Sequence, residues 1–492
     1  MSINAPAKAL TLKDYKSDLH NDWCPGCVTP ATRIVMGDGT SRPIAEVKVG
    51  DSVLAHDGKA HRVSEVMSHW HPDTLHRISV SGRGAVTLTA DHPVYIARID
   101  PVAETLKLEW ILAGEVMIGD QVLKPLGAPV VEFEKHPQPV ITAVTGLRGR
   151  NLMTVATGPV APSTFALGSV EANEVVPYNG YVHNLEVEDV HSYVTEQGAL
   201  HNCGDFGILT GIQMALQQMQ IEPDKLAVYS GIGCSGKTPH YINGYGFHTL
   251  HGRVLTVATG GRLANTDLTV LALGGDGDGY GIGAGYFVGA GRRNADFAYI
   301  VHNNNVYGLT KGQASPTLSK GKKTKSMPEQ AIQDGINPVA MAVASGYTFI
   351  ARGYALEPKY LASIIVKAVQ HKGSALVDVL QTCPTYNDLY TKEWYEGADL
   401  PEKRSRLYKL EDKGYDGKVQ DPTDAQEIVA KKAAAVARSY ETDPIPIGIY
   451  YQIELPTYED AVSQRIPALA EKPLVDQDVF HRDVTPLLEA MR

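Results

Sequence analysis

Cysteine is the residue type whose positions suggest the most chemistry in this chain, and the 492 residues contain five, at positions 24, 27, 203, 234 and 383. Cys24 is followed by Pro-Gly-Cys27, whereas Cys203 opens the run Cys-Gly-Asp-Phe-Gly. If Gly26 were joined directly to Cys203, the sequence would read Trp-Cys-Pro-Gly-Cys-Gly-Asp-Phe-Gly. Removing residues 27–202 takes out 176 residues, leaves 316, and keeps four cysteines. Four is the number of thiolates that hold an iron–sulfur cluster.

The borders of residues 27–202 carry the residue types that rearrange peptide bonds. Cys27 can attack the carbonyl of Gly26 and convert the amide into a thioester, and Cys203 can then take over the acyl group. Asn202 can attack its own backbone carbonyl, which cleaves the chain behind it and leaves a succinimide. Thiols suit these steps because sulfur is a good nucleophile and a good leaving group near neutral pH. The junctions therefore predict a segment that excises itself and joins its flanks.

This segment resembles the intein (Hint) family in motifs at both of its ends. The matching motifs are Cys27-Val-Thr-Pro-Ala-Thr-Arg-Ile, Gly50-Asp51-Ser52-Val53, Thr89-Ala90-Asp91-His92, the stretch from Tyr181 to Tyr193, and His201-Asn202-Cys203. The resemblance assigns splicing to Cys27, Thr89, His92, His191, His201, Asn202 and Cys203. In this family the histidine at His92 destabilises the upstream peptide bond. Many inteins have aspartate where this chain has Asn184, which bears on the coupling of the two cleavage steps. A Hint segment that only cleaves, leaving two fragments, is the alternative.

A second constellation of polar residues lies downstream. Gly275-Asp276-Gly277-Asp278 is followed, 28 residues after Asp276, by Asn304. A magnesium-bound diphosphate needs oxygen ligands arranged octahedrally around a small cation. The carboxylate of Asp276, the amide of Asn304 and the backbone carbonyl of Val306 would supply three ligands, and glycines let the backbone approach the phosphates. Gly-Asp-Gly with Asn-Asn at this distance is the signature of thiamine diphosphate binding.

The cysteines and this motif together resemble the β subunit of 2-oxoacid:ferredoxin oxidoreductases, over most of residues 10–26 and 203–400. The matching motifs are Trp23-Cys-Pro-Gly-(Cys203)-Gly, Ile232-Gly-Cys-Ser235, His248-x-x-His251-Gly-Arg253, Ala258-Thr-Gly260 and Tyr307-Gly-Leu-Thr-Lys-Gly-Gln313. The resemblance implies a [4Fe–4S] cluster on Cys24, Cys203, Cys234 and Cys383, and Mg2+ on Asp276, Asn304 and the carbonyl of Val306. Contacts to thiamine diphosphate would come from Ile232, Gly233, Cys234, Ser235, His251, Gly277, Asp278, Gly308 and Leu309.

Two of these assignments have alternatives. Four cysteines also suit a tetrahedral zinc site, although such sites usually contain two close pairs, and Cys234 and Cys383 stand alone. Lys311 is a candidate contact for the carboxylate of the substrate, and the alternative is a solvated loop lysine.

The reaction that the resemblance implies is oxidative decarboxylation of a 2-oxoacid to acyl-coenzyme A and CO2. Electrons would pass through the cluster to ferredoxin, and an α subunit would supply the glutamate that activates the thiamine ring. Non-oxidative decarboxylation or carboligation is the alternative, because those enzymes need no cluster. The 2-oxoacid stays open among pyruvate, 2-oxoglutarate and branched substrates.

The residue patterns predict an α/β thiamine-diphosphate-binding fold interrupted by an all-β Hint domain. Short alternating runs of β-branched residues dominate the insertion, whereas buried strands and helical stretches alternate after Cys203. The expected boundaries are 1–26, 27–202 with a connector at 126–172, 203–400 for the α/β domain, and 401–492 for a helical or irregular C-terminal region. Thr423-x-x-Gln426 predicts a capping box for a helix that runs through about Tyr440.

The composition of the chain bears on its binding partners and on its cellular location. The net charge is −10, from 45 basic and 55 acidic residues, which argues against a general nucleic-acid surface. The sequence has no apolar run of membrane-spanning length and no signal-peptide core at the N-terminus. Five cysteines in a chain of this length do not suggest a disulfide framework. We therefore expect a cytoplasmic protein without a membrane or nucleic-acid partner.

Overall fold

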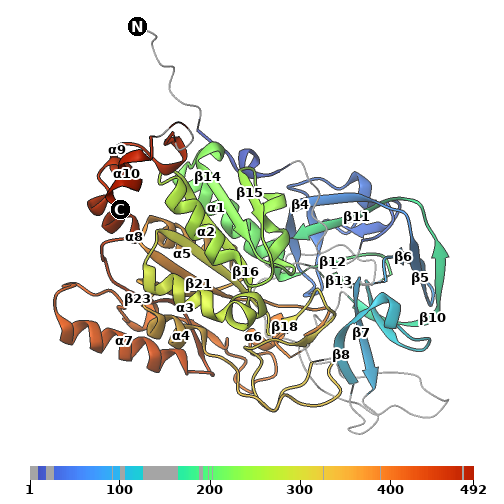
Figure 1. The fold of residues 1–492 in the computed structure, drawn as a ribbon. Coiled ribbons are helices and arrows are strands. Elements are labelled where there is room, and N and C mark those ends of the chain that lie inside the picture. Colours follow the sequence, from blue (N-terminus) through green and yellow to red (C-terminus); the bar gives the residue numbers. More distant parts are fainter. Residues whose placement is uncertain are drawn as a thin grey trace.

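The computed structural model contains two units, an all-β unit formed by the insertion and an α/β unit after it (Figure 1). The described residues are 9–17, 27–90, 92–99, 106–125, 165–187, 192–197, 199–201, 203–324, 326–387, 389–478, 481 and 483–491. Cys24, His191 and Asn202 lie outside them, and His201 is described by its backbone alone. The predicted fold class is confirmed.

Antiparallel strands build the all-β unit. They are β1 (Arg33–Val35), β2 (Ser41–Pro43), β3 (Ser52–Leu54), β4 (Ala60–His71), β5 (Thr74–Val80), β6 (Gly84–Leu88), β7 (Pro93–Ile99), β8 (Leu106–Leu112), β9 (Gln121–Pro125), β10 (Phe165–Pro177), β11 (Gly180–Val187), β12 (Ser192–Val194) and β13 (Ala199–His201). One sheet has the order β12-β13-β7-β9-β10-β5-β6, with β8 beside β7, and a second has the order β11-β4-β3. Val28 bridges the two sheets, because it pairs with Leu88 of β6 and with His183 of β11.

The predicted connector at 126–172 is too long at its carboxyl end. β10 begins at Phe165 and pairs with β9 over its first five residues, from Phe165↔Pro125 to Ser169↔Gln121, and then with β5. Its pairing partners lie 40 or more residues away in the sequence, so the local composition, rich in Pro, Gly and Val, does not reveal the strand. Residues 126–164 lie outside the described part of the chain.

The α/β unit is built on an eight-stranded sheet with the order β15-β14-β16-β17-β21-β20-β23-β22. Its strands are β14 (Leu226–Ser230), β15 (Tyr245–His248), β16 (Thr269–Gly275), β17 (Phe297–Asn303), β20 (Phe349–Tyr354), β21 (Ser374–Leu380), β22 (Leu407–Lys409) and β23 (Ile445–Gln452). The pairs from β15 to β20 are parallel, and only the β20–β23 pair is antiparallel. β18 (Val306–Tyr307) and β19 (Gln313–Ala314) form a separate small hairpin.

Helices cover both faces of this sheet, as Figure 1 shows. The helices of this unit are α1 (Gly204–Met219), α2 (Val254–Ala264), α3 (Ala284–Arg293), α4 (Pro338–Ser345), α5 (Pro358–Gln370), α6 (Lys392–Tyr395), α7 (Ala425–Ser439), α8 (Tyr458–Arg465), α9 (Ala468–Glu471) and α10 (Thr485–Ala490). Alternate strand residues enter different cores: Leu271 and Leu273 pack with α1 and α5, whereas Val270 and Ala272 pack with α2, α3, α4 and α7. This is the two-sided burial expected of a parallel sheet.

Two expectations for the C-terminal region need correction. β22 and β23 lie in the main sheet, so the α/β domain does not end at residue 400. β23 reaches β20 by a long-range antiparallel pairing that no local signal specifies. The helix near the C-terminus is present as α7, but its N-cap is Asp424, whose carboxylate accepts the backbone N–H groups of Gln426 and Glu427. Thr423 instead donates its hydroxyl to Asp421. No helix within the described residues is long and apolar enough to cross a membrane.

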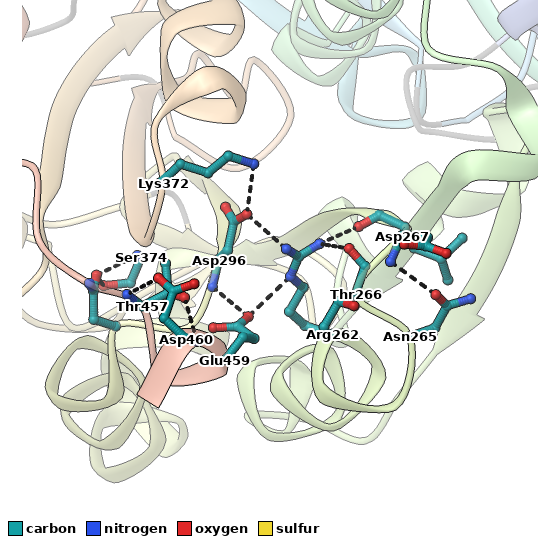
Figure 2. Close-up of polar contacts among 12 residues, drawn as sticks. Arg262, Asn265, Thr266, Asp267, Asp296, Lys372, Ser374, Thr457, Glu459 and Asp460 are labelled. Carbon is teal, nitrogen blue, oxygen red and sulfur yellow. Dashed lines mark hydrogen bonds and ion pairs between the residues drawn. The ribbon is translucent and has the colours of Figure 1, made fainter. Parts of the chain in front are cut away.

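A buried ionic network ties the C-terminal helix α8 to the sheet (Figure 2). Arg262 of α2 reaches Glu459 of α8 through Nε and Asp296 through Nη2, each at 3.0 Å. Its Nη1 donates to the carbonyl oxygens of Thr266 and Leu268 at 2.8 Å. The arginine side chain is only 13% exposed, so its charge is compensated almost entirely by these contacts.

We predict that Arg262→Met loosens α8 much more than a change at the edge of this network does. Removing the arginine leaves Asp296 and Glu459 as neighbouring, largely buried carboxylates, which costs about 3–5 kcal/mol. Lys372 also contacts Asp296, at 3.3 Å, but it is 72% exposed, so Lys372→Met should cost about 0–1 kcal/mol. Hydrogen–deuterium exchange of the α8 amides measures both effects. Equal protection of α8 in the two variants would contradict the role of Arg262.

Candidate functional site

Thr89 holds the backbone of Cys27 at the upstream junction. The Thr89 hydroxyl accepts the N–H of Cys27 at 2.8 Å, and the N–H of Thr89 donates to the carbonyl of Cys27 at 2.9 Å. Cys27 itself is buried, in contact with a small apolar cluster that contains Leu75 and Val182. These contacts hold both backbone groups of Cys27, and they place Thr89 beside the upstream border of the insertion.

His92, Tyr193 and Asn184 are buried beside this junction. The His92 ring is fully buried and stands edge-on to Tyr193, with ring centres 6.3 Å apart. The Tyr193 hydroxyl donates to the Asn184 amide oxygen at 2.8 Å. Burial, together with the charge of Cys27, raises the pKa of Tyr193 well above its usual value. The structure therefore gathers Cys27, Thr89 and His92 in one place and adds Tyr193, which lies in the C-terminal motif but was not predicted as a site residue.

The downstream junction enters the α/β unit directly. β13 pairs with β12 and with β7 of the all-β unit, and two residues later Cys203 is the N-cap of α1. The Cys203 thiol donates to the Asp205 carboxylate, with Sγ 3.2 Å from Oδ2, and Nε2 of Gln381 donates to the same sulfur at 3.7 Å. Cys203 is thus packed into the core of the α/β unit, although the residue before it in the chain belongs to the insertion.

Two other cysteines assigned to the cluster lie near enough to affect the charge of the Cys203 thiol. Burial raises the pKa of the Cys203 thiol well above its usual value, and the charges of Asp205, Cys383 and Cys234 add to this effect. Cys234 packs against the core cluster that contains Cys203, although these residues are 31 apart in the sequence. Within the described residues, no group of three or more His, Cys, Asp or Glu side chains is arranged to hold a single metal ion. A cluster is larger than one ion, and Cys24 lies outside the described part of the chain.

Asp276 stands at the carboxyl end of β16, where the sheet turns into a π-helical segment, η6 (Gly277–Ile282). Its Oδ2 accepts the Asn305 N–H at 3.1 Å, the Ser315 hydroxyl at 2.5 Å and the Thr317 hydroxyl. Its Oδ1 accepts only the adjacent Gly277 N–H, at 3.0 Å, within the described contacts. Burial raises the pKa of Asp276 to about 6, so a cation at Oδ1 would stabilise the ionised carboxylate.

Asn304 and Val306 follow the end of the neighbouring strand β17. Oδ1 of Asn304 accepts the Val306 N–H at 3.1 Å, and Nδ2 of Asn304 donates to Oε1 of Gln381 at 3.3 Å. Because β16 and β17 are parallel neighbours, Asp276 and Asn304 meet at the same edge of the sheet. Oxygen donors from two strand ends suit a magnesium ion.

The side chain of Asp278 is buried and forms hydrogen bonds with the loop after β14. Its Oδ1 accepts the N–H groups of Ile232 and Gly252 at 3.1 and 2.7 Å, and lies 2.9 Å from Nδ1 of His251. A Cβ at Gly231 would lie 2.1 Å from Oδ2 of Asp278, so this glycine permits the close approach. Asp278 thereby draws Ile232 and His251, two of the predicted cofactor contacts, toward each other.

Other predicted contacts lie around this edge. Ser235 is buried, and its hydroxyl has no hydrogen-bond partner within the described residues, although Oγ lies 3.5 Å from the Cβ position of Gly275. An unpartnered buried hydroxyl beside the strand end fits a polar ligand such as a diphosphate.

Gly308 approaches Cys234, since a Cβ there would lie 3.4 Å from the sulfur. Gly233 has φ +118°, and Gly277 lies against the Tyr307 ring. Leu309 and Lys311 are exposed on the β18–β19 turn, apart from these contacts.

The structure adds four residues that the sequence analysis did not select. Ser315 and Thr317 bind Asp276 from the loop after β19, and Gln381 and Asn387 bind Asn304 from the loop after β21. Gln381 and Asn387 flank Cys383 in the sequence, so a search around the assigned cysteines would have found them. Ser315 and Thr317 are not close in sequence to any of the assigned cysteines, so such a search would not have found them.

Three family models match parts of the chain. The C-terminal TPP-binding domain of thiamine pyrophosphate enzymes matches residues 231–379, the C-terminal part of the pyruvate ferredoxin oxidoreductase beta subunit matches residues 383–465, and the Hint module matches residues 22–149. The match over 383–465 agrees with the place of β23 in the main sheet.

Two relatives match more than half of the chain. The chain is 54% identical over 276 residues to the 2-oxoacid:ferredoxin oxidoreductase subunit beta of Saccharolobus solfataricus, covering 55% of this chain and 87% of that protein. It is 48% identical over 305 residues to subunit beta of 2-oxoacid:ferredoxin oxidoreductase 1 of Aeropyrum pernix, covering 61% and 92%. A solved 2-oxoglutarate:ferredoxin oxidoreductase from Magnetococcus marinus aligns at 30% identity with a TM-score of 0.49, over 59% of this chain and 90% of that one.

Proposed function

Because the chain belongs to the β subunits of 2-oxoacid:ferredoxin oxidoreductases and carries a Hint module within that sequence, we propose that it is a precursor that splices itself. Excision of residues 27–202 would join Gly26 to Cys203 and yield a 316-residue subunit. The observation that carries this proposal is the position of Cys203. This residue directly follows the Hint module, yet its sulfur lies in the core of the α/β unit with Cys234 nearby.

Splicing would use the residues gathered at the two junctions. The Cys27 sulfur attacks the Gly26 carbonyl, so a thioester forms as the amide bond breaks and its nitrogen takes up a proton. Thr89 holds both backbone groups of Cys27 during this step, and His92, whose backbone N–H donates to the Thr89 carbonyl, would assist it. The Cys203 thiol then displaces Cys27 from the acyl group. Cyclisation of Asn202 releases the Hint segment, and the acyl group moves from the Cys203 sulfur to its freed amine.

The spliced subunit would hold its cofactors at the carboxyl ends of β14, β16 and β17. Asp276, Asn304 and the Val306 carbonyl would bind magnesium, and Ile232, Ser235 and His251 would contact thiamine diphosphate. Asp276 offers Oδ1 for this purpose because Ser315, Thr317 and Asn305 occupy its other oxygen. When bound, thiamine diphosphate supplies the carbon nucleophile for decarboxylation of a 2-oxoacid.

The cluster site would form from Cys24, Cys203, Cys234 and Cys383. The loops after β14 and β21 carry Cys234 and Cys383, and the first turn of α1 begins at Cys203, so the same edge of the sheet supports both sites. A [4Fe–4S] cluster at this place supplies single-electron transfer to an external acceptor. A β subunit has partner subunits, and we propose an α subunit, coenzyme A and ferredoxin as the remaining components.

We predict that the spliced subunit turns over only with its α subunit and reduces ferredoxin in preference to NAD. Four cysteines suffice for one cluster, so the next electron carrier must be a separate protein. The experiment is an anaerobic assay of 2-oxoacid and coenzyme A consumption, with the subunits separate and mixed and with each acceptor. Fast turnover by the lone subunit, or a clear preference for NAD, would show that the proposed function is wrong. A mixture that decarboxylates without any acceptor would favour the non-oxidative alternative.

A further inference from the structure

Gln381 contacts both proposed cofactor sites at once. It follows directly after β21, and its backbone N–H donates to the Asn303 carbonyl at 2.9 Å. Its side chain is 1% exposed. Oε1 accepts Nδ2 of Asn304 at 3.3 Å, and Nε2 donates to the sulfur of Cys203 at 3.7 Å. One amide group therefore spans the gap between a proposed magnesium ligand and a proposed cluster ligand.

Tight packing keeps this side chain in place. Gly204, the residue after Cys203, lies so close that a Cβ there would be 2.7 Å from Cγ of Gln381 and 2.9 Å from the Thr382 carbonyl. The N–H of Gly204 also donates to this carbonyl, at 3.2 Å. The absence of a side chain at Gly204 thus permits α1 and the loop after β21 to pack together, which brings Gln381 to the Cys203 sulfur.

The two contacts fix the orientation of two amide groups. A side-chain amide donates only through its nitrogen and accepts only through its oxygen. Since Oε1 of Gln381 accepts from Asn304, Nε2 must face the sulfur. In the same way, Nδ2 of Asn304 donates to Gln381, so Oδ1 of Asn304 must point away from Gln381. There it accepts the Val306 N–H. That oxygen is the one that would bind magnesium.

We propose that Gln381 is a positioning residue shared by the two sites, an inference that rests on the proposed function. Its oxygen orients the Asn304 amide for the metal. Its N–H stabilises the negative charge on the Cys203 thiolate, and because a reduced cluster is more negative than an oxidised one, this hydrogen bond raises the reduction potential. A single side chain thereby adjusts the site that releases electrons and the site that accepts them.

Asn387 provides a matched control because it supports the same ligand without touching a sulfur. Its Nδ2 donates to the Asn304 backbone carbonyl at 2.8 Å, and its N–H donates to the carbonyl of Cys383 at 2.9 Å. Asn387 is also buried, so substitutions at the two positions disturb the packing of one loop to a similar degree. Only Gln381 adds a hydrogen bond to a thiolate within the described contacts.

The test uses the spliced subunit, prepared anaerobically with its α subunit, and compares Gln381→Leu, Gln381→Glu and Asn387→Ser with the parent. Binding of Mn2+ in the presence of thiamine diphosphate reports the metal site, and a redox titration followed by electron paramagnetic resonance reports the cluster. Gln381→Leu should weaken Mn2+ binding by about tenfold and shift the midpoint potential to lower values. Gln381→Glu keeps an acceptor for Asn304, so it should restore Mn2+ binding but not the potential. Asn387→Ser should weaken Mn2+ binding at an unchanged potential.

Four results would overturn the inference. If the parent contains a cluster and Gln381→Leu has the same potential as the parent, Gln381 does not act on the thiolate. If Asn387→Ser lowers the potential as much as Gln381→Leu does, packing of the loop explains the shift. If Gln381→Leu does not retain its cluster, Gln381→Glu is compared with the parent instead. An unchanged midpoint potential in Gln381→Glu would then show that Gln381 does not act on the thiolate. A parent without iron would overturn the proposed function and this inference together.

Discussion

Cys27→Ala combined with Asn202→Ala should abolish splicing completely and leave the 492-residue chain as the sole product. Cys27 is the only cysteine in residues 27–202, so no other thiol within the insertion can form the first thioester. Without Asn202, the downstream bond cannot be cleaved by cyclisation. The unmutated chain, expressed under reducing conditions, should yield a 316-residue protein and a 176-residue insert, which intact-mass spectrometry distinguishes from the precursor.

Cys234→Ala is the matched control for this experiment. It also removes a thiol, but one in the loop after β14 and outside both junctions, so it should splice like the parent. Recovery of only unligated fragments from the unmutated chain would rule out splicing and favour a Hint module that cleaves alone. Loss of splicing in Cys234→Ala would mean that folding of the α/β unit, and not the chemistry at Cys27, limits the reaction.

Asp276→Ala should weaken magnesium-dependent binding of thiamine diphosphate by roughly 100-fold, which corresponds to about 2.7 kcal/mol. The variant lacks the only charged group among the three proposed ligands, and the three donors at Oδ2 lose their acceptor. Asn304→Ala removes a neutral ligand and should cost about tenfold. Isothermal titration calorimetry of the spliced subunit with its α subunit measures both affinities.

The cluster serves as the internal control for these two variants. Its proposed ligands are cysteines that neither substitution removes, so the iron content and the visible absorption should match those of the parent. Unchanged cofactor affinity in Asp276→Ala would mean that the Gly-Asp-Gly motif is a structural turn. Loss of both the cofactor and the cluster would indicate that the variant has unfolded, and Asp276→Asn, which retains an oxygen at the same place, would then be measured instead.

The sequence predicted the parts of the fold that local patterns specify. The alternating runs of the insertion and the buried apolar runs after Cys203 identified strands of the correct kind, as β5, β16 and β17 show, because each buries its side chains in a regular order. The part of β10 before residue 173 and the whole of β23 were missed, since both are specified by partners far away in the chain. The cap of α7 was misplaced by one residue because Thr423 and Asp424 are both good caps, and only geometry distinguishes them.

The candidate site divides in the same way. Asp276 and Asn304 stand in a motif with fixed spacing, so they were found, whereas Ser315, Thr317 and Gln381 contact them only through the folding of separate loops. Four cysteines could be counted, but the sequence could not indicate that Cys203 is already packed in the α/β core with Cys234 nearby while the Hint module is still attached. That arrangement depends on α1 packing against β21 and its loop.

The iron and acid-labile sulfide content of the trapped precursor, compared with that of the spliced subunit, tests the central claim most directly. In the precursor, the Cys-x-x-Cys motif at Cys24 ends in Cys27, which is buried against Leu75 and Val182, in a different cluster of buried residues from Cys203. Only splicing places Cys203 in that motif. We expect four irons per spliced chain and little stable cluster in the Cys27→Ala, Asn202→Ala precursor. A precursor that holds four irons with full visible absorption would show that the cluster site does not depend on excision.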